Sequence, residues 1–488
     1  PECIIIQLDK QSSLKEIFFA LKRKDVRLII DVTCNYNLQG EKLELTSNCI
    51  LKFSGGTLNN GTLVGHNTCI DAPITVIFGS TINIEGEWNV DFSYPEWFGA
   101  RGDGVTDDRL PIQLSLNSFK TTRLLPHRYL IGSYQTINKK NYGLIIPAHH
   151  NLVSEGLFDL GSSAILIGNK KINIGLGVNQ YVTLRSISVL GYHYNSDMGG
   201  APGVVGSGTV GIGNADYGDW VRDLDFENVV SEAFDVGFKL MAFSVKFRSV
   251  WSRLCNVGFH FYSTKVGGIK GGCAGTTISM INCYADHIFT YGYLLENMWY
   301  SQLLNCSCDR VAETSSMGKP SLDQIKKSCA YRLVGSSNCS MISCGAETTY
   351  KVLEITGSNN SIISMQCYPA DAPTIKDSNG NKQPLDIIVI GDKGKTKTKN
   401  NLLINFQVNR TYNQYRSNVM DSDNEVCAID NIINPQKAVD SKRGSFEERP
   451  AAAKVGEGAL YYDTTNKRMI MSNGKEWVKM DGSPLHVY

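Results

Sequence analysis

Short runs in which apolar and polar positions alternate recur through the middle of the chain at a nearly constant step. One anchor is the sequence DVGFKL and its relatives, found at 235–240, 256–261, 290–295, 329–333 and 351–355. A second anchor lies upstream in each unit, as FEN, FRS, MIN, LLN and MIS at 226–228, 247–249, 280–282, 303–305 and 341–343. The bare step is about 21 to 23 residues, and two steps are lengthened by insertions. Units this short, without a helical period, each predict one coil of a parallel β-helix.

Aligning the units produces two columns directly after the second anchor. The first column consists of short polar residues, which tolerate left-handed backbone at a turn: Asn228, Ser249, Asn282, Asn305 and Ser343. The next column is small and apolar, and is therefore expected to face inward: Val229, Val250, Cys283, Cys306 and Cys344. The chain has 14 cysteines, but 488 residues can bury a core without disulfides. We therefore predict that these three cysteines are buried free thiols.

The segment ahead of the coils combines a tight loop with a short helix. It contains YPEWFGARGDGVTDD at 94–108, a helical stretch that ends at Phe119, and LLPHRYLI at 124–131. Gly102 and Gly104 permit the loop, and Thr106 or Asp107 is expected to cap the helix. An Asp-rich metal loop is the alternative interpretation, although a calcium site needs more oxygen ligands than this loop offers.

This opening resembles that of the pectate-lyase-like family found in phage tailspikes. The resemblance implies an all-β chain, a right-handed single-stranded parallel β-helix whose open end is covered by a capping helix at about 106–119. We expect an N-terminal β module over 1–93, the β-helix over 94–434 with coils that fade after about 410, and a linker with a small β segment over 435–488. A Gly-rich loop at 192–216 is too long to be a plain turn.

The last segment, GSFEERPAAAKVGEGALYYDTTNKRMIMSNGKEWVKMDG, resembles the small β appendages that follow fibre or spike bodies in phage tail proteins. This resemblance implies a virion-associated or extracellular protein, a polysaccharide partner and a homotrimer. A secreted or cell-surface monomer is the alternative, since a capped β-helix can be stable alone.

Charge and composition exclude several other classes. The chain has 48 basic and 47 acidic residues, so no overall field marks it as a nucleic-acid or membrane-surface binder. No apolar run approaches the roughly 18 residues of a membrane span. No phosphate-binding glycine loop opens a helix, which argues against a nucleotide site.

The repeat also aligns ionisable residues, four positions after the polar column. This ionisable column consists of Glu232, Arg253, Asp286, Asp309 and Glu347, and two positions earlier stand Val230, Trp251, Tyr284, Ser307 and Gly345. Period-2 alternation from the inward column places both sets on the outer face. Neighbouring coils lie about 4.8 Å apart, so three acids are expected to form one cluster.

Such a cluster suits glycoside hydrolysis, which needs one protonated and one ionised carboxyl beside the glycosidic bond. The candidate catalytic residues are Asp309, Asp286, Glu347 and Glu232. The candidate substrate-binding residues are Trp251 and Tyr284, which can stack on sugars, and the donors Arg253, His287 and Arg310. The insertion at 311–327 is expected to wall a groove beside Asp309.

Two geometries remain open for the catalytic pair. Acids on neighbouring coils imply retention of the anomeric configuration, whereas Asp286 with Glu347, two coils apart, implies inversion. We favour inversion, because a wider pair leaves room for water.

Two further functions remain open. A polysaccharide lyase would use Arg253 or Arg310 against a uronate, with Ca²⁺ held by the acids; otherwise we expect no cofactor and no metal. A non-catalytic glycan-binding or structural spike would leave the column as a solvated face, and the fold cannot separate these functions.

Overall fold

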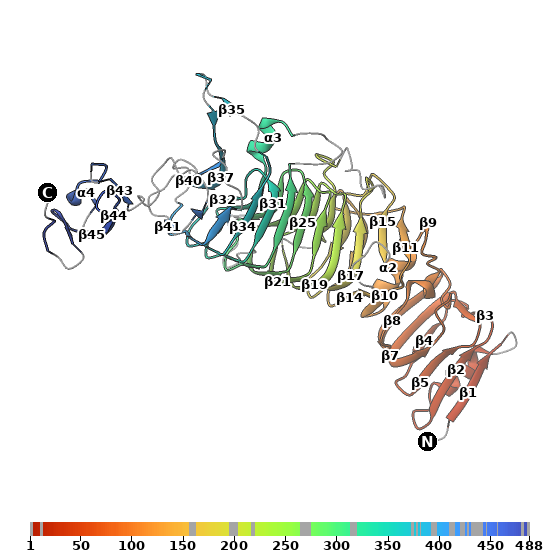
Figure 1. Cartoon of the computed structure of the whole chain (residues 1–488). Helices are drawn as coiled ribbons and strands as arrows, with labels where there is room; N and C mark the ends of the chain where they lie inside the picture. The colour runs from red at the N-terminus through yellow and green to blue at the C-terminus, as the bar shows by residue number, and fades with distance from the viewer. Residues whose placement is uncertain are drawn as a thin grey trace.

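The body of the protein is a right-handed parallel β-helix, as the family resemblance implied (Figure 1). This computed structural model describes residues 3–9, 13–155, 163–194, 204–215, 220–263, 275–312, 320–371, 375–376, 379–380, 382–391, 398–408, 415–419, 425–426, 429–430, 443–445, 447–455, 457–479 and 483–485. None of the helices in these ranges is long and apolar enough to cross a membrane.

Two long sheets form the walls of the β-helix. The larger consists of β10 (Thr121–Leu124), β11 (Arg128–Ile131), β14 (Asn151–Ser154), β15 (Ala164–Ile167), β17 (Thr183–Leu190), β19 (Val221–Glu232), β21 (Ala242–Arg248), β22 (Trp251–Arg253), β24 (Thr276–Ile281), β25 (Tyr284–Ile288), β27 (Gln302–Leu304), β28 (Ser307–Val311), β30 (Ser340–Ile342), β31 (Gly345–Thr349), β33 (Ser361–Ile363), β34 (Gln366–Pro369), β38 (Leu402–Ile404), β39 (Phe406–Val408), β41 (Glu425–Val426), β42 (Ile429–Asp430) and β9 (Asp103–Asp107). The smaller consists of β12 (Gln135–Ile137), β13 (Lys140–Ile146), β16 (Ile174–Val178), β18 (Val210–Asn214), β20 (Val236–Leu240), β23 (Val257–Tyr262), β26 (Tyr291–Glu296), β29 (Cys329–Val334), β32 (Leu353–Thr356), β37 (Leu385–Ile390) and β40 (Tyr415–Val419).

The coils continue further than the sequence pattern indicated. Strands β40, β41 and β42 still pair in parallel with the preceding coil, so the expected fading at about 410 is wrong. This parallel pairing reaches Asp430.

The polar column forms the corner between two strands of each coil. Asn228, Ser249, Asn282, Asn305 and Ser343 all have left-handed backbone, with φ of 52–53°. The strands before these corners are in register, and the Asn305 side-chain amide donates to Oδ1 of Asn282 at 2.7 Å. The predicted stacking of Asn282 on Asn305 is therefore confirmed.

The inward column lies in the core. Cys283, Cys306 and Cys344 are buried free cysteines, as predicted. Across the coil, rings stack along the axis at centroid distances of 4.9–5.0 Å, in the order Phe238, Phe259, Tyr293 and Tyr331. The Tyr293 hydroxyl donates to the carbonyl oxygen of Cys283 at 2.8 Å, which joins the two sheets through the core.

A short helix, α2 (Arg109–Ser118), covers the first coil, within the range predicted for the cap. Its Ile112 and Leu116 are buried in the β-helix core. The Gln113 side chain bonds the backbone of Ile145 on β13 twice, accepting at 2.9 Å and donating at 2.8 Å. The helix thereby satisfies polar groups on a strand edge that would otherwise be unpaired.

The helix start differs from the prediction. The residue at the cap position is Asp108, and its carboxylate accepts instead from the Arg101 and Gly102 amides of the loop. Asp107 reaches the Arg109 amide at 3.2 Å, but Thr106 donates its hydroxyl to Asp103.

The aspartates of this loop bind the loop itself. Asp103 accepts from the amides of Val105 and Thr106, and these hydrogen bonds lower its pKa to about 2. The described residues contain no group of three His, Cys, Asp or Glu side chains that could hold a metal ion.

Smaller units flank the β-helix (Figure 1). The N-terminal unit has its own core and consists of β1 (Cys3–Leu8), α1 (Leu14–Ala20), β2 (Arg27–Val32), β3 (Asn35–Asn37), β4 (Lys42–Leu45), β5 (Cys49–Phe53), β6 (Thr57–Asn59), β7 (Gly61–Asp71) and β8 (Ile82–Asn89), followed by η1 (Pro95–Phe98). The C-terminal unit consists of β43 (Arg443–Gly444), α4 (Ala452–Val455), β44 (Glu457–Asp463), β45 (Arg468–Asn473) and β46 (Trp477–Lys479). Two insertions stand out from the body, α3 (Leu322–Lys327) and the hairpin of β35 (Ile375–Lys376) and β36 (Lys382–Gln383).

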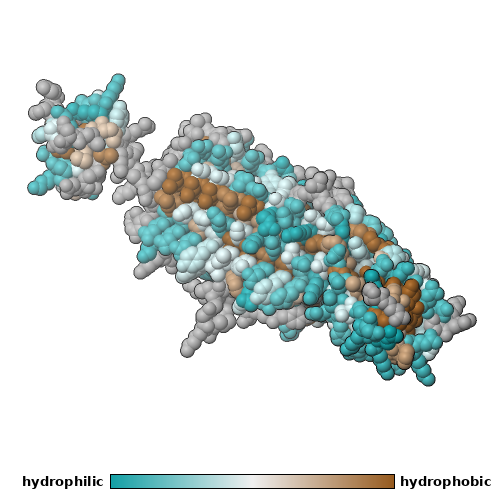
Figure 2. Space-filling view, turned by 90° about the horizontal axis from the view of Figure 1, so that it is seen from below, coloured by the Kyte–Doolittle hydropathy of each residue, from teal (hydrophilic) through white to brown (hydrophobic). Residues whose placement is uncertain are grey.

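An apolar stripe runs along the outside of the body. Five aliphatic side chains stack in register on successive outward positions and remain partly or fully exposed: Ile281, Leu304, Ile342, Ile363 and Ile404. Figure 2 shows a brown hydrophobic band along this part of the body. The outward column two residues earlier is polar on the first four of these strands, at Ser279, Gln302, Ser340 and Ser361.

We predict that His150 makes stability depend on pH. Burial lowers its pKa from 6.5 to about 4, so the unfolded chain takes up the proton first as pH falls. Between pH 6.5 and 4 this single group is expected to remove about 3 kcal/mol of stability. Urea unfolding across this range should show a smaller loss for His150→Gln than for wild type. The control His149→Gln, at an exposed neighbour, should behave as wild type; parallel losses in all three proteins would contradict the assignment.

Candidate active site

Strand pairing stacks the ionisable column as the repeat predicted. Glu232 on β19 lies beside Arg253 on β22, Arg253 beside Asp286 on β25, and Asp286 beside Asp309 on β28. Glu347 on β31 follows beside Asp309. Because parallel strands in register place equivalent side chains about 4.8 Å apart, the column is a row of closely spaced charges.

The column is much less exposed than the sequence pattern indicated. Glu232 is 2% exposed, and Asp286 and Asp309 are each 7% exposed, whereas Glu347 is exposed. Three of the four acids in this outer-face column are therefore nearly buried. Long side chains from the same face contact these carboxyls, which strand alternation cannot predict.

Arg253 forms ion pairs with the first two acids of the column, Glu232 and Asp286. It lies 3.8 Å from Oε2 of Glu232 and 3.3 Å from Oδ2 of Asp286. The longer contact exceeds hydrogen-bond distance, and Oε2 of Glu232 has no hydrogen-bond partner among the described residues. Burial raises the pKa of Glu232, against the opposing charge of Arg253.

Asp286 belongs to a chain of polar contacts that leads to Asp309. His287 Nδ1 lies 2.7 Å from Oδ1 of Asp286, and His287 Nε2 lies 2.5 Å from Nη1 of Arg310. The Nε of Arg310 lies 3.4 Å from Oδ2 of Asp309. Since Arg310 can only donate, Nε2 of His287 accepts and Nδ1 donates to Asp286.

These contacts give the two aspartates opposite shifts. Burial raises the pKa of Asp286, but the hydrogen bond from His287 and the charges of Arg253 and Arg310 outweigh it, so the pKa is lowered. Burial raises the pKa of Asp309, and the charges of Asp286 and Glu347 add to this against Arg310. Asp286 is thus held ionised, whereas the environment of Asp309 favours its protonated form.

A groove of about 450 Å³ lies over Asp309 and Glu347. Its lining consists of Trp251, Asn282, Tyr284, Asn305, Ser307, Cys308, Asp309, Gly345, Ala346, Glu347, Gln366 and Tyr368. Trp251 and Tyr284 meet edge to face, with ring centroids 4.9 Å apart. The Tyr284 hydroxyl donates to Oδ2 of Asp309 at 3.4 Å, and Oδ1 of Asp309 has no hydrogen-bond partner within the described part of the chain.

The groove contains only some of the candidate residues. Trp251, Tyr284, Asp309 and Glu347 line it together. The other candidates are absent from its lining and contact one another or Asp309; they are Glu232, Arg253, Asp286, His287 and Arg310. In the expected groove wall at 311–327, residues 313–319 lie outside the described residues, as do 195–203 and 216 of the Gly-rich loop.

Tyr368 and Gln366 line the groove but were not among the residues predicted from the sequence. Tyr368 pairs in register with Glu347, and Gln366 pairs with Gly345, one coil further along. The sequence SIISMQCY at 361–368 repeats the pattern of SMISCGAE at 340–347, which was the available signal. The Tyr368 side chain is 47% exposed and forms the end of the groove opposite Trp251.

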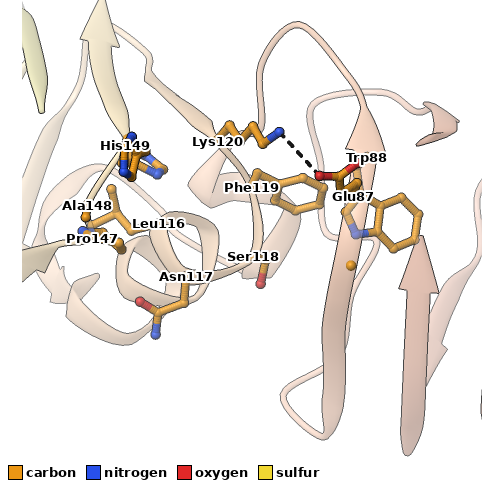
Figure 3. A pocket seen from close by; sticks show the side chains of 12 residues that line it. Glu87, Trp88, Leu116, Asn117, Ser118, Phe119, Lys120, Pro147, Ala148 and His149 are labelled. Carbon is orange, nitrogen blue, oxygen red and sulfur yellow. Dashed lines mark ion pairs between the residues drawn. The ribbon is translucent and has the colours of Figure 1, made fainter. Parts of the chain in front are cut away.

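A second cavity, of about 550 Å³, lies between the N-terminal unit and the β-helix (Figure 3). Trp88, Phe119, Lys120 and His149 are among its lining residues. Its one acid, Glu87, forms an exposed ion pair with Lys120 at 3.8 Å. This cavity therefore lacks the paired carboxyls found in the groove.

The solved structures that are similar to this chain share its fold. No family model and no curated protein matches this chain. The enzymatically active domain of tailspike protein 2 of bacteriophage CBA120 is similar at 15% identity, over 71% of this chain and 46% of that chain, with a TM-score of 0.41. This chain therefore spans less than half the length of that protein.

Two other solved structures are similar to this chain. The tailspike of Acinetobacter phage vb_AbaP_AS12 is 12% identical over 79% of this chain and 76% of its own, with a TM-score of 0.47. The A-module of a mannuronan C-5 epimerase from Azotobacter vinelandii is 13% identical over 71% and 98%, with a TM-score of 0.37. Likeness at this level carries no argument about activity, so the site is judged on its own geometry.

We predict that Arg253 stabilises the fold by compensating buried acids. Arg253→Met leaves Glu232 without its cation and is expected to cost about 3 kcal/mol, measured by urea unfolding. Arg185→Met, which removes an exposed ion pair with Glu227, is expected to cost less than about 1 kcal/mol. Adding Glu232→Gln to Arg253→Met should recover part of the loss. Equal stability of the two single variants would refute this role.

Proposed function

We propose that this chain is a polysaccharide-cleaving β-helix protein, a glycoside hydrolase with Asp309 and Glu347 as its catalytic pair. The observation that carries the proposal is the position of these acids on neighbouring coils, inside a groove with aromatic side chains. Hydrolysis of a glycosidic bond needs two carboxyls in different protonation states, and only one of this pair is buried.

In the proposed mechanism Asp309 is the general acid. Its raised pKa favours the protonated form, which can donate to the leaving glycosidic oxygen as the bond to the anomeric carbon breaks. Glu347 attacks the anomeric carbon from the opposite face and forms a covalent glycosyl ester. Asp309, now ionised, takes a proton from the water that hydrolyses this ester, which restores both carboxyls.

The pairing of neighbouring coils changes the expected stereochemistry. Carboxyls about 5 Å apart are typical of retaining enzymes, and neighbouring coils lie about 4.8 Å apart. The inverting pair of Asp286 with Glu347, favoured from the sequence, is less suitable because Asp286 is bound by Arg253 and His287 and does not line the groove. We therefore propose retention, with Asp286 as a fixed negative charge that favours protonation of Asp309.

The lyase alternative is less well supported. A lyase neutralises the uronate with cations, and the described groove lining contains no lysine or arginine. Arg253 and Arg310 are engaged by the acids of the column. A purely glycan-binding spike would use the same groove without cleavage. In either case we propose an extracellular or virion-associated site of action, where surface polysaccharides are accessible.

Removal of either catalytic acid is expected to abolish cleavage. Asp309→Asn and Glu347→Gln should each lower the release of reducing ends from a susceptible polysaccharide by about 10²-fold or more. Asp323→Asn, on the exposed helix α3, is the matched control and should keep full activity with the same unfolding temperature. Proton NMR of the first product should show the anomeric configuration of the substrate. Full activity in both groove variants would exclude this pair.

We also propose a homotrimer in which the apolar stripe is covered. Light scattering at micromolar concentration should give three times the 53.8 kDa of one chain. Ile342→Lys is expected to shift the protein toward single chains, because it places a charge in an apolar contact. Ser340→Lys, on the neighbouring outward column, is the control and should leave the mass unchanged. A single-chain mass for the wild type would contradict the trimer.

A further inference from the structure

The groove carries acids but no cations. Among the described residues that line it, the ionisable carboxyls are Asp309 and Glu347, and lysine, arginine and histidine are absent. Glu347 is exposed in the groove, and Asp286 lies one coil behind Asp309. An anionic sugar bound here would therefore meet negative charges at close range.

Two arginines close to the groove already form ion pairs with acids of the column. Arg253 forms ion pairs with Glu232 and Asp286, and Arg310 contacts Asp309 and His287. Turning either arginine toward a ligand would leave a nearly buried acid without its partner, which is costly. The column therefore has no spare positive charge for a carboxylate, sulfate or phosphate on the ligand.

The polar groups of the groove are neutral. Asn282, Asn305 and Gln366 supply exposed amides to the groove lining, and Ser307 adds a hydroxyl. The Asn305 amide donates to Asn282, so each of these two asparagines retains further donor or acceptor capacity. Amides that both donate and accept match the hydroxyl groups of uncharged sugars.

Aromatic rings mark the two ends of the groove. Trp251 and Tyr284 lie at one end, and Tyr368 lies at the other. The strand that carries Trp251 and the strand that carries Tyr368 are four coils apart, or about 19 Å along the axis. Rings this far apart can hold several consecutive sugar units by stacking, without any charge.

From this arrangement we infer that the groove takes a neutral stretch of glycan, whose bound sugar units carry no carboxylate, sulfate or phosphate. The inference rests on the proposed function and narrows its substrate class.

The test uses matched polymers that differ only in charge. Full-length Asp309→Asn, which cannot cleave, is measured by affinity electrophoresis against a panel of neutral polysaccharides. The same polymers are then tested after oxidation of their primary alcohols to carboxylates. We expect binding to a neutral polymer, at least tenfold weaker binding to its oxidised form, and partial recovery in high salt. Equal or tighter binding to the oxidised form, weakened by salt, would overturn the inference.

A second substitution tests whether the polymer binds in the groove. Adding Trp251→Ala to Asp309→Asn should weaken binding of the neutral polymer at least tenfold, because it removes a stacking surface. Adding Trp299→Ala, at a tryptophan that is 42% exposed outside the groove, should leave binding unchanged. Equal losses from the two tryptophan variants would overturn the assignment of the binding to the groove.

Experiments with the wild-type chain distinguish failure of the hydrolase proposal from failure of the proposed substrate class. Binding of a neutral polymer without release of reducing ends would refute the hydrolase and leave the substrate class standing. Cleavage of a polymer charged on every unit would refute the substrate class and leave the hydrolase standing.

Discussion

The structure depends on the left-handed corner residues that let each coil turn and stack in register on the last. Asn and Ser accept φ near +53° at modest cost, and Asn305 also bonds to Asn282 on the coil before it. Once the corner residues of neighbouring coils lie in register, all the remaining positions of those coils lie in register as well. Inside the coil, cysteine side chains stack on cysteine side chains and aromatic rings stack on aromatic rings. Outside, aliphatic side chains form one continuous stripe.

The same stacking creates an electrostatic problem on the outer face. Asp286, Asp309 and Glu347 lie on consecutive coils about 4.8 Å apart and would repel one another strongly if all were ionised. Arg253 separates Glu232 from Asp286, and His287 supports Asp286 with a hydrogen bond. Asp309 has acids on both neighbouring coils, and the Nε of Arg310 lies 3.4 Å from its carboxylate. Burial and the two neighbouring acids raise the pKa of Asp309 against the charge of Arg310.

A groove forms where bulky outward residues flank small ones. Gly345 and Ser307 leave space between Trp251 and Tyr284 on one side and Tyr368 on the other. Asp309 and Glu347 lie at this gap, with one acid buried and the other exposed. The arrangement thus combines a nearly buried carboxyl, an exposed carboxyl and aromatic surfaces, and the described lining residues include no lysine, arginine or histidine.

The sequence by itself determined the coil, its corners, the buried thiols and the order of the ionisable column, because a repeat in register fixes neighbours through backbone pairing alone. It did not determine which acids reach the groove, that Asp108 starts the capping helix, or that coils continue past 410. Those outcomes depend on side chains from separate coils, such as Arg253 over Glu232 and Tyr284 over Asp309. Burial and pKa follow from these contacts in three dimensions, and only the tertiary structure decided them.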